Sequence, residues 1–508
     1  MRRLIALVVL ASATATAVDA APVRFFAVGH KQQIADVVTY QAFHDKMAAL
    51  MDITFPGRSS LVEAGVDDVA SHLAPVDPAA PPNALVLFPE DTGLLAAFIG
   101  SRGAQARAES VSTFAIVRLS ATYGPLITYY QAKFPDQPFI RYLILALTDT
   151  FYRSVYETFS ELARTHGVYV AVGTNMAPAR RVEEADEPAL VATLRDPDEP
   201  GRTYAYEATT AFAPNTTLVF APDGEILVAD GSGGTLRSPS QTNGTIRGST
   251  QKAYLTPIEQ PPPGNGAGLS LSTTPVRDME VIDTPVGRLA IVISKDAWMI
   301  DVNDRFVAKG ANVVLQPEAF DSWAFTTTEW SPDVFREGGF ANLQKNPEWV
   351  TNLDASMTGN LFEITFDGQT SIIGRKQKVL PGPLDGRNAW IGQNADTALR
   401  AVVPWVVPDP GIANPTATLG ERRATLAATG ATLLPDSPDL CPGPLVVGAC
   451  RNGYRDCTVS IDCYDLVLER FWIGLLLTLV MIASMVLVVR YASVYVRLRD
   501  EERRKRLQ

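Results

Sequence analysis

The chain has 508 residues, of which 46% are hydrophobic and 19% charged, a composition that excludes a disordered polymer because it can bury a large core. The formal net charge is -11, and no basic stripe appears ahead of the C-terminus. Since nucleic-acid binding draws on clustered Lys and Arg, we expect no nucleic-acid partner.

The first 20 residues are typical of a secretory signal peptide. Arg2 and Arg3 precede an apolar run at 4–10, and residues 18–20 form a small-x-small cleavage site. A buried first helix is the alternative, but a strand-like run begins at Val23, directly after that site. We therefore expect residues 1–20 to be removed and the body of the chain to be exported.

Residues 21–408 alternate short apolar runs with helical stretches, which predicts one large α/β domain. Several runs are continuously apolar, as is typical of strands buried on both faces. We expect strands at 23–28, 84–88, 168–173, 217–220, 289–294 and 313–316, and helices at 41–51, 151–165 and 301–309. The polar stretch at 230–250 is rich in Gly and Ser, and a surface loop is expected at 255–275.

A stalk and a cysteine-rich segment are expected after this domain. Residues 409–440 are rich in Pro, Ala and Thr, and the segment at 441–465 holds all the cysteines of the chain, Cys441, Cys450, Cys457 and Cys463. In an exported protein this even number indicates two disulfides, with three possible pairings. A zinc site is the alternative, although the spacing lacks a Cys-x-x-Cys pair.

The run at 471–489 contains no charged residue and predicts a transmembrane helix. At about 1.5 Å per residue it would extend roughly 28 Å, close to a hydrocarbon core of about 30 Å. Arg and Lys residues concentrate in the tail at 490–508, which predicts that the tail is cytoplasmic. We therefore expect a single-pass type I membrane protein whose main domain lies outside the cytoplasm.

Three local patterns carry residues suited to the hydrolysis of an acyl group. A buried strand ends in Phe88-Pro89-Glu90, Lys252 precedes Tyr254-Leu255, and a second buried strand ends in Ser294-Lys295-Asp296. A carboxylate held near an ammonium and a nucleophile can take a proton and return it to a leaving amine. An ordinary ion pair between Glu90 and Lys252 is the alternative interpretation.

With these patterns, residues 23–408 resemble the nitrilase, or carbon-nitrogen hydrolase, superfamily. The resemblance rests on Phe88-Pro89-Glu90, on Lys252 with Tyr254-Leu255, on Gly287-Arg288-Leu289 leading to Ser294-Lys295-Asp296, and on Gly310-Ala311. Residues 367–372 also look like a late strand of that family. The resemblance implies a nitrilase-like α-β-β-α sandwich and a homodimer, since family members usually pair through their domains.

The resemblance implies a role for each candidate site residue. Glu90 corresponds to the general base, Lys252 to the cation that stabilises the oxyanion, and the backbone N–H of Lys295 to an oxyanion donor. Glu259 corresponds to the auxiliary carboxylate of some members. Ser294 occupies the position of the cysteine nucleophile.

Ser294 is therefore the departure from the family pattern. A cysteine is a few per cent thiolate at neutral pH, whereas a serine hydroxyl needs a strong, positioned base. Residues 21–440 contain no cysteine that could replace it. Serine–lysine dyads do work as catalysts, and Lys252 and Lys295 are the candidates here.

Three functions remain open at this stage. The first is a degenerate domain that binds a small amide-like or acyl ligand, or a partner, without turnover. The second is an active amidase-type hydrolase that uses Ser294 with Glu90 and Lys252. The third is an N-acyltransferase, because the stretch from Phe88 to Thr92 resembles apolipoprotein N-acyltransferases; those enzymes have several membrane spans ahead of the domain, unlike this chain. Membrane-tethered pantetheinases and biotinidase are closer in layout.

The histidines do not indicate a metal enzyme. His30, His44, His72 and His166 are scattered, without the spacing of metal ligands. We therefore expect neither a metal nor another cofactor.

Overall fold

The computed structural model describes residues 23–54, 84–260, 268–320, 351–368, 370–374, 389–391 and 397–403, together with residues 338, 339, 342, 343, 346 and 349. The expected signal peptide, stalk, four cysteines, apolar run at 471–489 and basic tail lie outside the described residues. Within the described ranges, no helix is both long and apolar enough to cross a bilayer.

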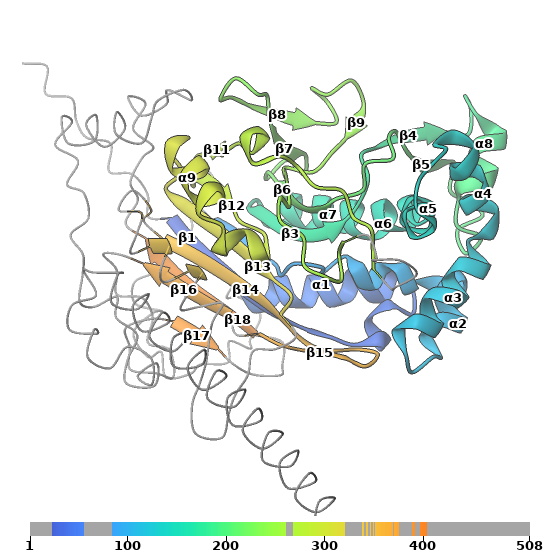
Figure 1. The fold of residues 1–508 in the computed structure, drawn as a ribbon, viewed down its shortest axis with the longest axis horizontal. Coiled ribbons are helices and arrows are strands. Elements are labelled where there is room, and N and C mark those ends of the chain that lie inside the picture. The colour runs from blue at the N-terminus through green and yellow to red at the C-terminus, as the bar shows by residue number, and fades with distance from the viewer. Residues whose placement is uncertain are drawn as a thin grey trace, which may run out of the picture.

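The first sheet joins strands from the two ends of the described chain (Figure 1). Its order is β18, β1, β2, β3, β6, β7 and β8, with the short β10 beside β6. β1, β2 and β3 run parallel, whereas β18 and β6 are antiparallel to their neighbours. The bounds are Val23–Gln32 (β1), Ala84–Leu87 (β2), Tyr169–Asn175 (β3), Asn215–Phe220 (β6), Ile226–Ala229 (β7), Thr235–Ser238 (β8), Thr250–Gln251 (β10) and Thr397–Val403 (β18).

The second sheet has the order β11, β12, β13, β14, β16 and β17. β12, β13 and β14 run parallel, and β15 forms a hairpin with β14. The last residues of β1 pair with β14, with His30 opposite Met357, so β1 links the two sheets. The bounds are Ile282–Thr284 (β11), Gly287–Ile291 (β12), Val313–Glu318 (β13), Thr351–Leu361 (β14), Ile364–Asp367 (β15), Thr370–Gly374 (β16) and Ala389–Ile391 (β17).

Most helices lie between β1 and β3 in the sequence. Their bounds are Tyr40–Thr54 (α1), Gly100–Arg107 (α2), Ser112–Thr122 (α3), Gly124–Lys133 (α4), Phe139–Ala146 (α5), Thr148–Phe151 (α6), Glu157–His166 (α7), Pro188–Leu194 (α8) and Ile300–Ala308 (α9). A separate small sheet contains β4 (Ala179–Glu183), β5 (Tyr204–Ala208) and β9 (Thr245–Ile246). Figure 1 shows α2 to α5 gathered at one end of the molecule.

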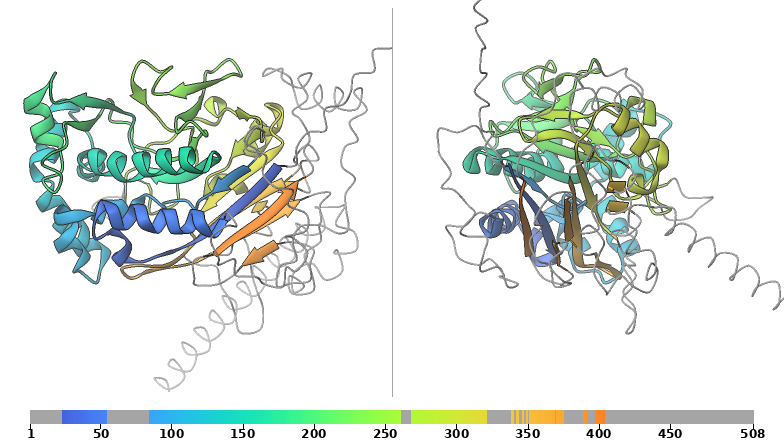
Figure 2. Two further views of the ribbon diagram at one scale, coloured as in Figure 1. Left: turned by 180° about the vertical axis from the view of Figure 1, so that it is seen from behind. Right: turned by 90° about the vertical axis from the view of Figure 1, so that its left-hand side faces the viewer.

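The strands bury both faces, and this produces four layers. Phe25 of β1 packs in a cluster with Leu315 of the second sheet, so these side chains fill the space between the sheets. The next residue, Phe26, faces the other way and packs in a cluster with Phe159 of α7, because side chains alternate along a strand. On the far side, Phe306 of α9 covers the second sheet. Figure 2 shows α1 and α9 on opposite sides of the strands.

The prediction of a mixed α/β fold is confirmed, and each expected strand and helix has a counterpart at nearly the expected residues. The stretch at 151–165, expected as one helix, is instead interrupted by a turn of π-helix at Tyr152–Tyr156. The Ser154 hydroxyl donates to the Thr150 carbonyl at 2.7 Å, a bond that competes with the helical ladder. Helices α2 to α5 were not expected; each has only 8 to 11 residues, and α2, α3 and α4 show little helical periodicity.

Candidate functional site

The Glu90 side chain lies just beyond the end of β2. The N–H of Phe88 still donates to the Ala171 carbonyl of β3 at 2.8 Å, after which the chain turns inward. Gly173 of β3 lies against this turn, where a Cβ would come within 2.6 Å of Glu90 Cα. Glycine is therefore required beside the turn that buries Glu90, whose residue is only 3% exposed.

Lys252 reaches Glu90 from the end of β10, a strand that pairs with β6 and not with β2. It follows β10 directly, and its N–H donates to the Asn215 carbonyl of β6 at 2.9 Å. Its ammonium lies 2.7 Å from Glu90 Oε1 and 2.9 Å from Glu259 Oε2, and the lysine is 1% exposed. One buried cation therefore neutralises two buried carboxylates.

Asn215, the first residue of β6, connects the same two carboxylates. Its Nδ2 donates at 2.7 Å to Glu90 Oε1 and at 2.7 Å to Glu259 Oε1. The N–H of Ala319 donates to the other Glu90 oxygen at 3.0 Å. We call Glu90, Lys252, Asn215 and Glu259 the Lys252 cluster.

The Lys252 cluster separates the proton affinities of its members. Burial raises the pKa of Glu90, and Lys252 only partly offsets that effect. Glu259 is also desolvated, but Lys252 and Asn215 outweigh burial and hold its pKa below the ordinary value. Burial opposes the charge of Lys252, but the two carboxylates outweigh it and raise its pKa, so Lys252 stays an ammonium at neutral pH.

Ser294 lies after β12 at the start of a short 3-10 helix, Ser294–Trp298. Its φ is 48°, a left-handed conformation that is uncommon for a residue with a side chain and that often marks a functional turn. The Asp296 carboxylate accepts the N–H of Tyr254 at 2.8 Å and the N–H of Ala253 at 3.1 Å. These bonds tie the Ser294 turn to the segment that carries Lys252.

The five predicted site residues line one cavity of about 630 Å³, which brings Glu90, Lys252, Glu259, Ser294 and Lys295 together. The Lys295 ammonium donates to the Leu255 carbonyl at 3.0 Å. Within the described part of the chain, the Ser294 hydroxyl has no hydrogen-bond partner. The arrangement thus combines a carboxylate of raised pKa, a fixed ammonium and a free hydroxyl around one space.

Three polar residues of this site were missed at the sequence level. Asp91 lines the cavity with a φ of 57°, accepts a hydrogen bond from Asn175 at 2.6 Å, and has its pKa raised to about 8, chiefly by burial. Asn175 lies at the end of β3 and Asn215 at the start of β6. Their location at strand ends was the only sequence signal. A single Asp or Asn at a strand end is too common to indicate a functional site.

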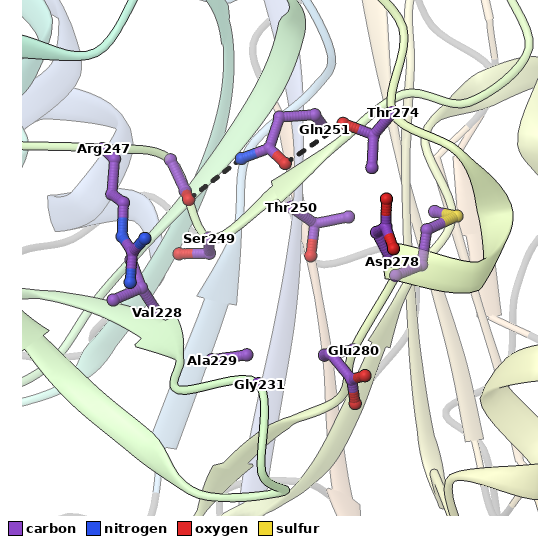
Figure 3. Close-up of a pocket in the computed structure, with 12 residues that line it drawn as sticks. Val228, Ala229, Gly231, Arg247, Ser249, Thr250, Gln251, Thr274, Asp278 and Glu280 are labelled. Atoms are coloured by element: carbon purple, nitrogen blue, oxygen red, sulfur yellow. Dashed lines mark hydrogen bonds between the residues drawn. The ribbon is translucent and has the colours of Figure 1, made fainter.

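A second, smaller hollow of about 190 Å³ lies beside β7 and β10 (Figure 3). Gln251 spans one side of it, donating to the Gly248 carbonyl at 3.1 Å and accepting from the Thr274 hydroxyl at 3.3 Å. Glu280 lines it but is already paired with Arg305 at 2.7 Å. This hollow contains none of the predicted site residues, so the larger cavity is the candidate functional site.

No metal site accompanies the cavity in the described residues. Over those ranges, no group of three or more His, Cys, Asp or Glu side chains could hold a metal ion. The Lys252 ammonium occupies the space between Glu90 and Glu259 where a cation would be held.

Comparison with solved structures finds similar chains among carbon-nitrogen hydrolases and amidases. A carbon-nitrogen hydrolase from Helicobacter pylori G27 is 13% identical, with a TM-score of 0.38, and the match covers 81% of this chain and 94% of that one. A mutant of the amidase from Nesterenkonia sp. AN1 is 14% identical, with a TM-score of 0.36 and coverages of 80% and 99%. The C. elegans NitFhit protein is 13% identical, with a TM-score of 0.37 and coverages of 80% and 64%. No family model and no curated protein matches the chain.

Proposed function

We propose that this chain is a carbon-nitrogen hydrolase-like protein that binds a small amide or acyl ligand without turning it over. The observation that carries the proposal is the Lys252 cluster, which shares one cavity with Ser294. A buried ammonium can polarise a carbonyl oxygen, and the Glu90 carboxylate can accept a hydrogen bond from an amide N–H. The cavity therefore carries both groups that recognise an amide.

The absence of turnover follows from the strength of the available bases. Lys252 holds its proton between Glu90 and Glu259, so it is not free to deprotonate Ser294. Glu90 has a raised pKa, but a carboxylate remains a weak base for an alcohol. Lys295, the other lysine in the cavity, is bound to the Leu255 carbonyl. A cysteine at position 294 would need far less help, because its thiol ionises much more readily.

An active serine amidase is the second candidate. It is favoured by the φ of 48° at Ser294, since a strained turn is a common way to present a nucleophile. The raised pKa of Glu90 favours it as well, because a general base works best when its pKa is near the working pH. Under this alternative, Ser294 attacks the carbonyl carbon, Glu90 transfers the proton and the backbone N–H of Lys295 binds the oxyanion.

The location of the ligand-binding domain is part of the proposal. Residues 1–20 and 471–489 support export of the domain and anchorage by one C-terminal helix, with the cavity outside the cytoplasm. The stalk at 409–440 and two disulfides among the four cysteines would then lie between the domain and the membrane. A homodimer is proposed from the family resemblance alone.

Substitution of Ser294 distinguishes the two candidates. The purified full-length chain, Ser294→Cys and Ser294→Ala are each assayed for ammonia release from small primary amides. We expect no turnover by the wild type or by Ser294→Ala above the uncatalysed reaction, and turnover by Ser294→Cys at least about a hundredfold above that background. Turnover by the wild type that is lost in Ser294→Ala would overturn the proposal and support the serine amidase.

A further inference from the structure

Polar and charged side chains surround the smaller hollow beside β7 and β10 (Figure 3). Among the described residues, it shares no lining residue with the cavity that holds the Lys252 cluster. At about 190 Å³ it is smaller than the pockets of roughly 300–1,000 Å³ that hold drug-sized ligands. The hollow therefore fits only a small molecule.

Thr250 brings an unused hydroxyl to this hollow. The residue is 4% exposed, and within the described ranges its Oγ1 is buried without a hydrogen-bond partner. Figure 3 shows the Thr250 side chain in the middle of the lining residues. Because a buried hydroxyl without a partner is costly, folded proteins normally provide one. A polar ligand in the hollow would supply the missing partner.

Arg247 gives one side of the hollow a positive charge. In the described part of the chain its guanidinium has no hydrogen bond or ion pair, and only its backbone N–H is bonded, to the Ser238 hydroxyl. Ser249 lies on the same side of Thr250 in Figure 3. Its Oγ accepts the N–H of Val219 at 2.8 Å, which leaves the hydroxyl proton free to donate. A guanidinium and a hydroxyl are donors suited to a carboxylate.

Asp278 gives the opposite side of the hollow a negative charge (Figure 3). Its ion pair with Arg277 is long, at 3.8 Å, and weak, because the two side chains are 56% and 83% exposed. Glu280 also lines the hollow, but it is already paired with Arg305 at 2.7 Å and Lys309 at 2.8 Å. Asp278 is therefore the carboxylate that is available to bind an ammonium.

Hydrogen bonds hold the walls of the hollow in position. Gln251 accepts from the Thr274 hydroxyl at 3.3 Å, and the Thr274 N–H donates to the Lys252 carbonyl at 3.3 Å. On the side of Asp278, Arg305 of α9 donates to the Met279 carbonyl at 2.9 Å. A site that is already ordered loses less entropy when a ligand binds.

We propose that the hollow binds a small amino acid, with its carboxylate beside Arg247 and Ser249 and its ammonium beside Asp278. A zwitterion satisfies both charges, whereas a simple anion would face Asp278 and a simple cation would face Arg247. The Thr250 hydroxyl lies between the two charged sides, where it can bond to the same ligand. This binding site goes beyond the function proposed for the larger cavity and does not depend on it.

Isothermal calorimetry with the full-length chain tests the site. The probes are alanine, β-alanine and 4-aminobutyrate, which place the two charges progressively farther apart, with propanoate and propylamine as single-charge controls. Arg247→Met removes the cation, and Thr250→Val removes the hydroxyl while keeping a β-branched side chain. Arg277→Met is the matched control, because Arg277 is an exposed arginine next to Asp278 that does not line the hollow.

We expect at least one amino acid to bind more tightly than either single-charge control. Arg247→Met and Thr250→Val should each weaken that binding at least about tenfold, and Arg277→Met should bind no more weakly than the wild type. Because the Thr250 hydroxyl has no partner in the described structure, Thr250→Val should be at least as stable as the wild type in thermal unfolding. Its loss of binding would then not reflect a loss of folding.

The amino-acid site is overturned if none of the three amino acids binds, or if propanoate or propylamine binds as tightly as the best of them. It is also overturned if Arg247→Met leaves the affinity unchanged, or if Arg277→Met lowers it equally. In either of those cases the ligand would bind elsewhere on the chain.

Discussion

Two groups of buried carboxyl side chains lie next to each other, yet they have different partners. In the Lys252 cluster, Glu90 and Glu259 share one ammonium and one amide donor. One residue before the Ala319 N–H that binds Glu90, Glu318 lies on β13, with Asp354 on the adjacent β14. Neither of these two has a cationic partner within the described ranges; Glu318 accepts from Gln316 at 2.8 Å.

The difference shows what keeps a buried carboxylate charged. Burial raises the pKa of Glu318 and Asp354 well above their ordinary values, and the charge of Lys252 does not outweigh burial at Glu318 as it helps to do at Glu259. Burial therefore favours the uncharged form of Glu318 and Asp354, whereas Lys252 favours the ionised form of Glu259. A charged, polarising site forms where a cation enters the core, and where no cation is paired with a buried acid, burial favours the protonated form.

Removing the Lys252 ammonium should cause the largest loss in the free energy of unfolding. Lys252→Met leaves Glu90 and Glu259 buried without their partner, and we expect the free energy of unfolding to fall by about 3–5 kcal/mol. Lys295→Met, in the same cavity, loses one hydrogen bond to a carbonyl and should cost about 1 kcal/mol. Urea denaturation at neutral pH measures both. Equal losses in the two variants would mean that the carboxylates do not depend on Lys252.

The residues that could be predicted from the sequence lie at the ends of strongly apolar strands. Glu90 and Ser294 each follow a run that is buried on both faces, so the end of the run marked the position. Glu259 was proposed only through the family resemblance. Their catalytic roles stay predictions, whereas their common cavity is a property of the structure.

The apolar residues that line the cavity, such as Leu361, and Asn215 could not be predicted in the same way. Leu361 reaches the cavity through the pairing of β14 with strands hundreds of residues away in the sequence, such as β1. Such register depends on long-range contacts, which no local periodicity encodes. Helix α3, whose Ser112 N–H donates to Glu363 at the tip of the β14–β15 hairpin, shows no clear helical period in the sequence.

Removing the Asn215 amide, which Glu90 and Glu259 share, should cause the next largest loss in the free energy of unfolding. Asn215→Ala deprives Glu90 and Glu259 of one donor each, so we expect a loss of about 1–3 kcal/mol in the free energy of unfolding. Asn175→Ala is the matched control, since Asn175 donates to Asp91 alone, and it should lose about half as much. Thermal and urea denaturation compare the two. The bridging role of Asn215 is contradicted if Asn175→Ala proves the more damaging change.

The smallest effect on stability should come from replacing an acid that has no cationic partner. This replacement should stabilise the folded protein, whereas the two changes above destabilise it. Because the folded-state pKa of Asp354 is raised, its contribution to stability is complete below the unfolded pKa of about 3.9 and is lost as the pH rises toward the folded value. The Asp354→Asn variant cannot ionise at position 354. At about pH 8 it should therefore be more stable than the wild type by on the order of 1 kcal/mol, and at about pH 4 the two should be nearly equal.

The Glu207→Gln variant should show the opposite pH dependence. Burial opposes the charge of Glu207, but hydrogen bonds from Lys133 and Arg180 outweigh burial and hold the Glu207 pKa below its ordinary value. The ionised Glu207 therefore stabilises the fold above the unfolded pKa, and Glu207→Gln should lose that stability there. Urea denaturation at the two pH values measures both variants, and a loss of stability in Asp354→Asn at about pH 8 would show that this acid is ionised in the folded protein.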